Sequence, residues 1–314
     1  MDQLNQSYKL PDRGNWTGRA TSVEGEYWYQ QISLQDIEQL GEGKVDIALV
    51  GYACDEGVRR NQGRVGAIEG PDSIRGRLGK IAFHHQKSVV DVGDVVCVDG
   101  DMESAQEVLS QLTEKLLRSK TFPIVMGGGH DVAYGHFNGI KRAFPDKKIG
   151  ILNFDAHFDL RPVVGQPSSG TPFYQILTEN DEVDYMVVGI HPSSNTNALF
   201  DFAREKNVKF WPIEECLWMP IGEIETGLQN FIQKSDLIYV CIDLDGFSSA
   251  YAPGVSAPSP IGLNPRFVLK ALEVLLESGK VVSIDIAELN PSLDQDQQTA
   301  NLAAKLIDFV TASK

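Results

Sequence analysis

The stretch IGILNFDAHFD, residues 149–159, changes character after Phe154. Its first six residues are mostly apolar, which is typical of a strand buried on both faces of a parallel sheet. Asp155, His157 and Asp159 then alternate, so an extended chain points all three side chains to one side. Such a group stays poorly solvated and self-repelling unless a cation lies within it. A solvated edge strand is the alternative, but the buried-type residues before Asp155 favour a buried strand that ends in metal ligands.

Seven further runs read as strands, at residues 45–51, 88–92, 123–126, 185–190, 209–212, 237–243 and 281–285. Helical patterns lie between them. Asp101 can cap a helix with an apolar stripe to Leu116, Asn264-Pro265 can begin another that stops at Gly279, and residues 303–310 have the stripe of a last helix. This alternation predicts an open, mostly parallel α/β sheet, in which ligands bind at the carboxyl ends of the strands.

The composition is that of a globular protein. The 314 residues include 42% hydrophobic and 23% charged side chains, with a formal net charge of −15. This acidity disfavours generic binding to nucleic acid or anionic membranes, which needs a basic face. With no internal repeat or linker in view, we expect an N-terminal extension over residues 1–40, with some helix at 34–40, and a single catalytic domain over residues 41–314.

Signals for a compartment are mostly absent. Residues 1–16 are polar, and no stretch approaches the roughly 18 apolar residues of a membrane-spanning helix. Cys54, Cys97, Cys216 and Cys241 show no CxxC spacing, so we interpret them as reduced structural thiols. The sequence therefore predicts a cytoplasmic protein.

Two more strand ends carry polar residues that can bind metal. GGGHD at 127–131 places His130 after residues 123–126, and DLD at 243–245 ends the run 237–243. The first could also be a plain turn or a phosphate-binding loop, although the downstream Gly-Lys-Ser/Thr of a P-loop is missing. The second, taken alone, is common in surface turns. Together the three strand ends offer two imidazoles and four carboxylates: His130, Asp155, His157, Asp159, Asp243 and Asp245.

This set of side chains is richer than one catalytic metal needs, because such a metal takes about three protein ligands. Four carboxylates match the charge of two divalent ions, which indicates a binuclear centre. Carboxylate and imidazole ligands without thiolate favour Mn²⁺, and they do not exclude zinc or iron.

GGGHD, NFDAHFD (153–159), IDLDGF (242–247) and AELNP (287–291) stand in this order. In these motifs the chain resembles the ureohydrolases, the arginase and agmatinase superfamily, from about residue 45 to the end. The resemblance implies a three-layer α/β/α sandwich around an eight-stranded, mostly parallel sheet, and two Mn²⁺ ions per subunit. By the same resemblance, Asp155 and Asp243 bridge the ions. His130 and Asp159 complete one ion, His157 and Asp245 complete the other, and Glu288 pairs with a cationic amidine or guanidine.

Four further stretches narrow the resemblance: VRRNQGR (58–64), DLRP (159–162), SSGTPF (168–173) and APGVSAP (252–258). They look most like the branch that hydrolyses N-formimidoyl-L-glutamate to L-glutamate and formamide in histidine degradation. Arginases carry a histidine after DAHxD that is thought to shuttle protons. Here that segment reads SSGTP, which counts against arginase activity and leaves Asp159 as a candidate proton carrier.

The expected small-molecule substrate has two carboxylates, and arginine is suited to pair with carboxylates in a bidentate manner. Arg59, Arg60, Arg64 and Arg161 are therefore candidate substrate-binding residues, with solvated surface arginines as the alternative. Asp159 and Glu288 are the candidate catalytic residues of a metal-assisted hydrolysis. Another ureohydrolase activity (agmatinase, guanidinobutyrase or arginase) and a non-catalytic metal-binding protein remain as alternatives. The resemblance also allows a homo-oligomer.

Overall fold

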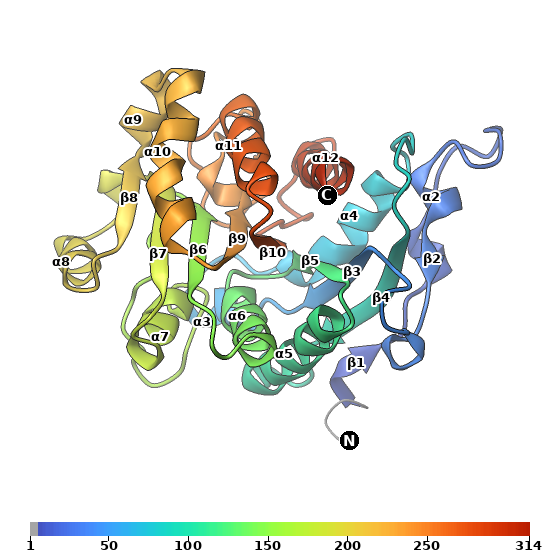
Figure 1. Ribbon diagram of the computed structural model, residues 1–314, viewed down its shortest axis with the longest axis horizontal. Coiled ribbons are helices and arrows are strands. Elements are labelled where there is room, and N and C mark those ends of the chain that lie inside the picture. The colour runs from blue at the N-terminus through green and yellow to red at the C-terminus, as the bar shows by residue number, and fades with distance from the viewer. Residues whose placement is uncertain (1–5) are drawn as a thin grey trace.

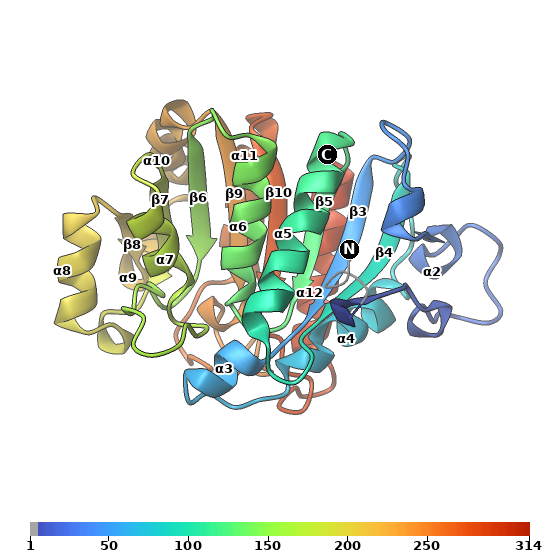
Figure 2. The same cartoon turned by 90° about the horizontal axis from the view of Figure 1, so that it is seen from below.

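The computed structural model describes residues 6–314, which form a twisted sheet covered by helices on both faces (Figures 1 and 2). All eight strands expected from the sequence are present. In the order in which they lie across the sheet they are β4 (Val89–Val96), β3 (Ile47–Ala53), β5 (Phe122–Gly127), β10 (Val281–Ala287), β9 (Leu237–Asp243), β6 (Ile149–Phe154), β7 (Asp184–Ile190) and β8 (Lys209–Pro212). Every neighbouring pair among these eight is parallel, which confirms the predicted fold class.

The helices form two layers, one on each face of the sheet (Figure 1). One layer packs with the larger core cluster and consists of α4 (Gly70–Leu78), α10 (Ile221–Lys234), α11 (Pro265–Glu277) and α12 (Gln298–Ser313). The opposite layer consists of α5 (Met102–Arg118), α6 (Val132–Ala143) and α7 (Pro172–Glu179). The short helices α2 (Trp28–Gln31), α3 (Glu56–Arg60), α8 (Asn197–Glu205) and α9 (Ile213–Trp218) lie toward the edges and loops.

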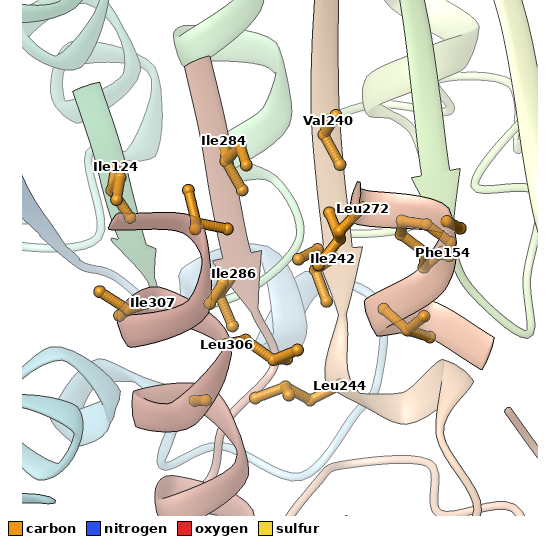
Figure 3. Packing of buried hydrophobic residues seen from close by; sticks show 14 of the residues in the cluster. Ile124, Phe154, Val240, Ile242, Leu244, Leu272, Ile284, Ile286, Leu306 and Ile307 are labelled. Atoms are coloured by element: carbon orange, nitrogen blue, oxygen red, sulfur yellow. The ribbon is translucent and has the colours of Figure 1, made fainter. Parts of the chain in front are cut away.

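The helix boundaries follow the predicted caps. The Asp101 carboxylate accepts a hydrogen bond from the Ser104 backbone N–H at 3.0 Å and begins α5. The Asn264 side chain likewise accepts from the Phe267 N–H at 2.9 Å and begins α11. Figure 3 shows the resulting core, in which Leu272 of α11 and Leu306 and Ile307 of α12 pack on apolar side chains of β10 and β9.

The N-terminal residues build onto the β4 edge of the sheet. β1 (Tyr8–Lys9) pairs antiparallel with β4, and β2 (Ser33–Leu34) pairs parallel with it, giving ten strands in all. The helix expected at residues 34–40 is reduced to a 3-10 turn at Ile37–Gln39. Pairing with β4 holds Leu34 in extended form, and the Asp36 carboxylate caps the turn by accepting from the Glu38 N–H at 2.9 Å.

A buried ion cluster joins α4 to β4. Arg75 donates to both carboxylate oxygens of Asp91, at 2.8 and 3.0 Å, and to Asp94 at 2.6 Å. Arg75 is 1% exposed and Asp91 is fully buried. The Trp16 indole N–H also donates to Asp91 at 2.8 Å, so the same carboxylate anchors the N-terminal segment. None of the helices within residues 6–314 is long and apolar enough to cross a membrane.

Replacing Arg75 with methionine keeps an unbranched apolar stem but removes the guanidinium, which leaves Asp91 and Asp94 buried without their cation. Breaking a buried ion pair from one side costs about 3–5 kcal/mol, so we expect a clearly lower urea midpoint for R75M in an unfolding titration. Arg77 of the same helix has no ion-pair partner among residues 6–314 and provides the control R77M. Equal midpoints for the two variants would contradict this role.

Candidate metal centre

Four adjacent strands deliver polar side chains to one edge of the sheet. The strand order β5-β10-β9-β6 places the ends of these strands side by side. His130 follows β5, Asp155 follows β6, and Asp243 ends β9. Glu288 follows β10. The parallel topology therefore brings together motifs that are up to about half of the chain apart in sequence.

The predicted ligands form two overlapping groups: His130, Asp155, Asp159 and Asp243 in one, and Asp155, His157 and Asp245 in the other. In each group the candidate ligand atoms lie within 4.8 Å of one another. Asp155 belongs to both. Its Oδ2 lies 3.2 Å from His130 Nδ1, and its Oδ1 lies 3.5 Å from His157 Nδ1. The structure thus gathers all six residues around one shared carboxylate.

The spacing around His130 is that of a cation site. Its Nδ1 lies 3.0 Å from the nearest carboxylate oxygens of Asp159 and Asp243, in addition to the contact with Asp155. One ring nitrogen carries at most one proton and cannot satisfy three carboxylates. In the second group, His157 Nδ1 lies 3.3 Å from Asp245 Oδ2, and the buried Asp245 Oδ1 has no hydrogen-bond partner within residues 6–314. Oxygen and imidazole ligands in this number fit two divalent ions of the Mn²⁺ type.

The pKa shifts of these residues also fit a cation site. Burial and the charges of Asp245 and Asp155 raise the pKa of Asp243 well above its ordinary value. Burial alone would lower the pKa of His130, but the Asp243 charge and the neighbouring carboxylates raise it well above the ordinary range. Without cations, protons are therefore held among these residues, and divalent ions binding here would displace them.

Two local backbone features make the close approach of these segments feasible. A Cβ at Gly246 would lie 2.8 Å from the Asp155 Cα and 3.0 Å from its nitrogen, so the loop after β9 can pass Asp155 only as glycine. Asp159 and Glu288 adopt left-handed backbone conformations, with φ of 49° and 67°. Such conformations are strained for residues with a side chain and tend to cluster at functional sites.

A cavity of about 330 Å³ opens above the two groups. His157, Asp159, Asp243 and Asp245 reach it from the metal-ligand side, together with Glu288. The Glu288 Oε1 atom accepts a hydrogen bond from the His130 backbone N–H at 2.9 Å. Burial and the Asp245 charge raise the pKa of Glu288 to about 8. The cavity floor thus combines the candidate ligands with a carboxylate suited to a cationic group.

This chain is similar in sequence to proteins of a known family. The family described as Arginase matches residues 45–312. The chain belongs to the arginase family. A curated formimidoylglutamase from Geobacillus kaustophilus (strain HTA426) is 42% identical over 305 residues, covering 95% of this chain and 94% of that protein. Another, from Aeromonas salmonicida (strain A449), is 40% identical over 312 residues, covering 97% of this chain and 99% of its own.

Solved structures give the same picture. The crystal structure of Trypanosoma cruzi formiminoglutamase with Mn²⁺ has a TM-score of 0.78 and 25% identity, covering 89% of this chain and 98% of that one. The formimidoylglutamase from Bacillus subtilis has a TM-score of 0.82 at 23% identity, covering 96% and 97%, and it supports the fold. The arginase-type sheet implied by the sequence motifs is therefore confirmed.

The four candidate arginines of this arginase-family chain lie in two different environments. Arg64 and Arg161 line the cavity. Arg64 is anchored by donating to the carbonyl oxygens of Val255, at 2.9 Å, and Ser256, at 2.8 and 3.0 Å. Arg161 is exposed at the cavity mouth, and within residues 6–314 its guanidinium has no ion-pair partner. Both can face an anionic ligand.

Arg59 and Arg60 are placed outside the cavity lining. Arg59 donates to Glu56 at 2.5 and 2.6 Å. Arg60 donates to Glu56 at 2.8 Å, to Glu103 at 2.7 Å and to the Pro167 carbonyl at 3.2 Å, with its side chain 7% exposed. Arg60 thus ties α3 to the loop that follows Arg161. Both arginines already have carboxylate partners, so an interaction with substrate carboxylates rests on Arg64 and Arg161.

Several cavity residues were not anticipated from the sequence. They are Val58, Asn61, Gln62, Gly63, Ser169, Ser194, Asn195, Leu199, Ser256 and Ala257. A signal existed for most of this set, because Val58, residues 61–63, Ser169, Ser256 and Ala257 lie in the stretches 58–64, 168–173 and 252–258 that carry the resemblance. Residues 194–199 closely follow the predicted strand 185–190 at the same sheet edge.

The Gly246→Ala variant tests the close approach at Asp155. The added methyl group must displace the Asp155 backbone, and disturbing the support of a ligand typically costs 10–100-fold in metal affinity. We expect weaker Mn²⁺ binding by roughly that factor in calorimetric titration. A Cβ at Gly76 meets nothing within 4 Å, so Gly76→Ala is the matched control. Unchanged Mn²⁺ affinity in Gly246→Ala would refute this steric constraint.

Proposed function

We propose that this chain is a binuclear manganese hydrolase that converts N-formimidoyl-L-glutamate and water to L-glutamate and formamide. The observation that carries the proposal is a set of six side chains that could hold metal, four of which line a cavity together with Glu288, Arg64 and Arg161. The formimidoylglutamases that are about 40% identical over nearly the whole chain support the choice of substrate.

In this proposal the six side chains would hold two Mn²⁺ ions, with Asp155 and Asp243 shared between them. His130 and Asp159 would serve one ion, and His157 and Asp245 the other. The two oxygens of Asp155 face different histidines, which supports its bridging role. When bound, two such metal ions lower the pKa of a water molecule and supply a hydroxide nucleophile near neutral pH.

The remaining residues bind and orient the substrate. One oxygen of Glu288 is held by the His130 N–H, which leaves the other oxygen to pair with the amidinium group. A cation beside Glu288 lowers the pKa of this carboxyl group from about 8 and keeps it ionised. Arg64 and Arg161 pair with the two carboxylates of the glutamate portion, which places the formimidoyl carbon over the metal ligands.

Proton transfer completes the reaction. Water adds its oxygen to the formimidoyl carbon, the bond from this carbon to the glutamate nitrogen breaks, and that nitrogen leaves as an amine after gaining a proton. We assign this proton transfer to Asp159, which lies in the cavity wall with Oδ2 3.0 Å from His130 Nδ1. Asp159 could also act only as a metal ligand. An Asp159→Asn variant that keeps its manganese and still loses turnover would show that the proton-transfer role is separate from metal binding.

A substrate panel tests the activity. With Mn²⁺-loaded protein we expect formamide release from N-formimidoyl-L-glutamate and no urea release from arginine or agmatine. Agmatine lacks a carboxylate and leaves both cavity arginines without a carboxylate partner. Urea release would assign another ureohydrolase activity. No turnover at full manganese occupancy would indicate a metal-binding protein without catalysis.

Arg161→Met tests the substrate-binding wall. A charge-assisted hydrogen bond contributes about 1.5–3 kcal/mol, which corresponds to a roughly 10- to 100-fold loss in kcat/KM, and we expect most of the loss in KM. Arg59→Met removes an arginine of the same charge that lies outside the cavity lining and should change kcat/KM less than about threefold. Equal effects of the two substitutions in steady-state kinetics would contradict the assignment.

A further inference from the structure

The turn after β6 supplies three of the six proposed ligands within five residues. The Asp155 N–H still donates to the Val188 carbonyl of β7 at 3.0 Å, and beyond this point the turn leaves the sheet. Residues 156–158 are therefore without ladder partners, although Ala156 and Phe158 are buried. Buried backbone groups need hydrogen bonds from some other source.

Asn195 supplies those hydrogen bonds from a different loop. Its side-chain Oδ1 accepts from the Phe158 N–H at 3.0 Å, and its Nδ2 donates to the Ala156 carbonyl at 2.9 Å. The same Nδ2 donates to the His191 carbonyl at 2.9 Å, and the His191 N–H donates to Ala156 at 3.0 Å. The side-chain amide therefore bonds the backbone on both sides of His157 and ties it to the end of β7.

These bonds also occupy the donors of the amide. Asn195 lines the cavity, but it is only 7% exposed and both of its N–H groups point to backbone carbonyls. It is therefore poorly placed to donate to a substrate. Its contacts are instead with the turn in which His157 lies between the two carboxylates Asp155 and Asp159.

We infer that Asn195 is a positioning residue for the metal centre, which fixes the 155–159 turn so that its three ligands converge. This inference rests on the proposed metal centre and is independent of the substrate. Few side chains can replace Asn195. Aspartate would present an acceptor to the carbonyls of Ala156 and His191, and serine offers a single donor for the two of them.

The test is Mn²⁺ affinity in the full chain, measured by calorimetric titration and by the electron paramagnetic resonance signal of free Mn²⁺. We expect Asn195→Asp to weaken binding by about 10- to 100-fold, as for other residues that support metal ligands. Asn195→Ser, which keeps one donor and one acceptor, should give a smaller loss. Asn197→Asp adds the same charge two residues away at an exposed position and should bind as the unmodified chain does.

Thermal unfolding of the metal-free variants separates positioning from general stability. A positioning role predicts weakened Mn²⁺ binding in Asn195→Ser even where its metal-free melting temperature is close to that of the unmodified chain. Unmodified Mn²⁺ affinity in either folded Asn195 variant would overturn the inference. The substrate panel tests the proposed reaction independently. If the unmodified chain binds Mn²⁺ but does not release formamide, the proposed reaction is refuted, whereas the positioning role of Asn195 still stands.

Discussion

The centre of this structure is constrained by the mutual repulsion of four neighbouring carboxylates, those of Asp155, Asp159, Asp243 and Asp245. Their oxygens converge on two imidazoles at a mostly buried sheet edge, where like charges disfavour ionisation. Within the described residues, no lysine or arginine forms an ion pair with any of the four. Two divalent cations would neutralise these four carboxylates. The carboxylates account for four of the fifteen excess negative charges of the chain.

The rest of the fold serves to hold these groups together. The sheet order brings four strand ends side by side, and Gly246 allows the loop after β9 to approach Asp155. Away from this site, β1 pairs with β4. We propose that residues 41–314 act as one catalytic unit and that residues 1–40 are an extension of it. Trp16, hydrogen-bonded to Asp91, links that extension to the sheet.

Much of this arrangement could be predicted from local sequence. Apolar runs gave the eight strands, since strands buried on both faces must be apolar, and the caps Asp101 and Asn264 gave helix starts. The convergence of the candidate ligands was predictable because parallel strands end at a common edge. The six side chains do converge there, whereas the binding of two Mn²⁺ ions to them stays a proposal.

The remainder depends on contacts that have no local pattern. Local sequence suggested a helix at 34–40, but pairing with β4 keeps Leu34 extended. Arg59 and Arg60 were candidates for substrate binding because arginine pairs well with carboxylates and because both follow the first predicted strand. In the structure both pair with Glu56, three and four residues before them. At that helical spacing ion pairs form readily. Asn195 acts on backbone atoms of a distant turn, which no residue pattern reveals.

We propose that two metal ions share the Asp155 carboxylate, and anomalous diffraction at the manganese edge from Mn²⁺-soaked crystals tests this most directly. We expect two anomalous peaks about 3.5–4 Å apart, as in other binuclear sites. One peak should lie beside His130 and the other beside His157, with Asp155 contacting both. A single peak, or two peaks without Asp155 between them, would contradict the account.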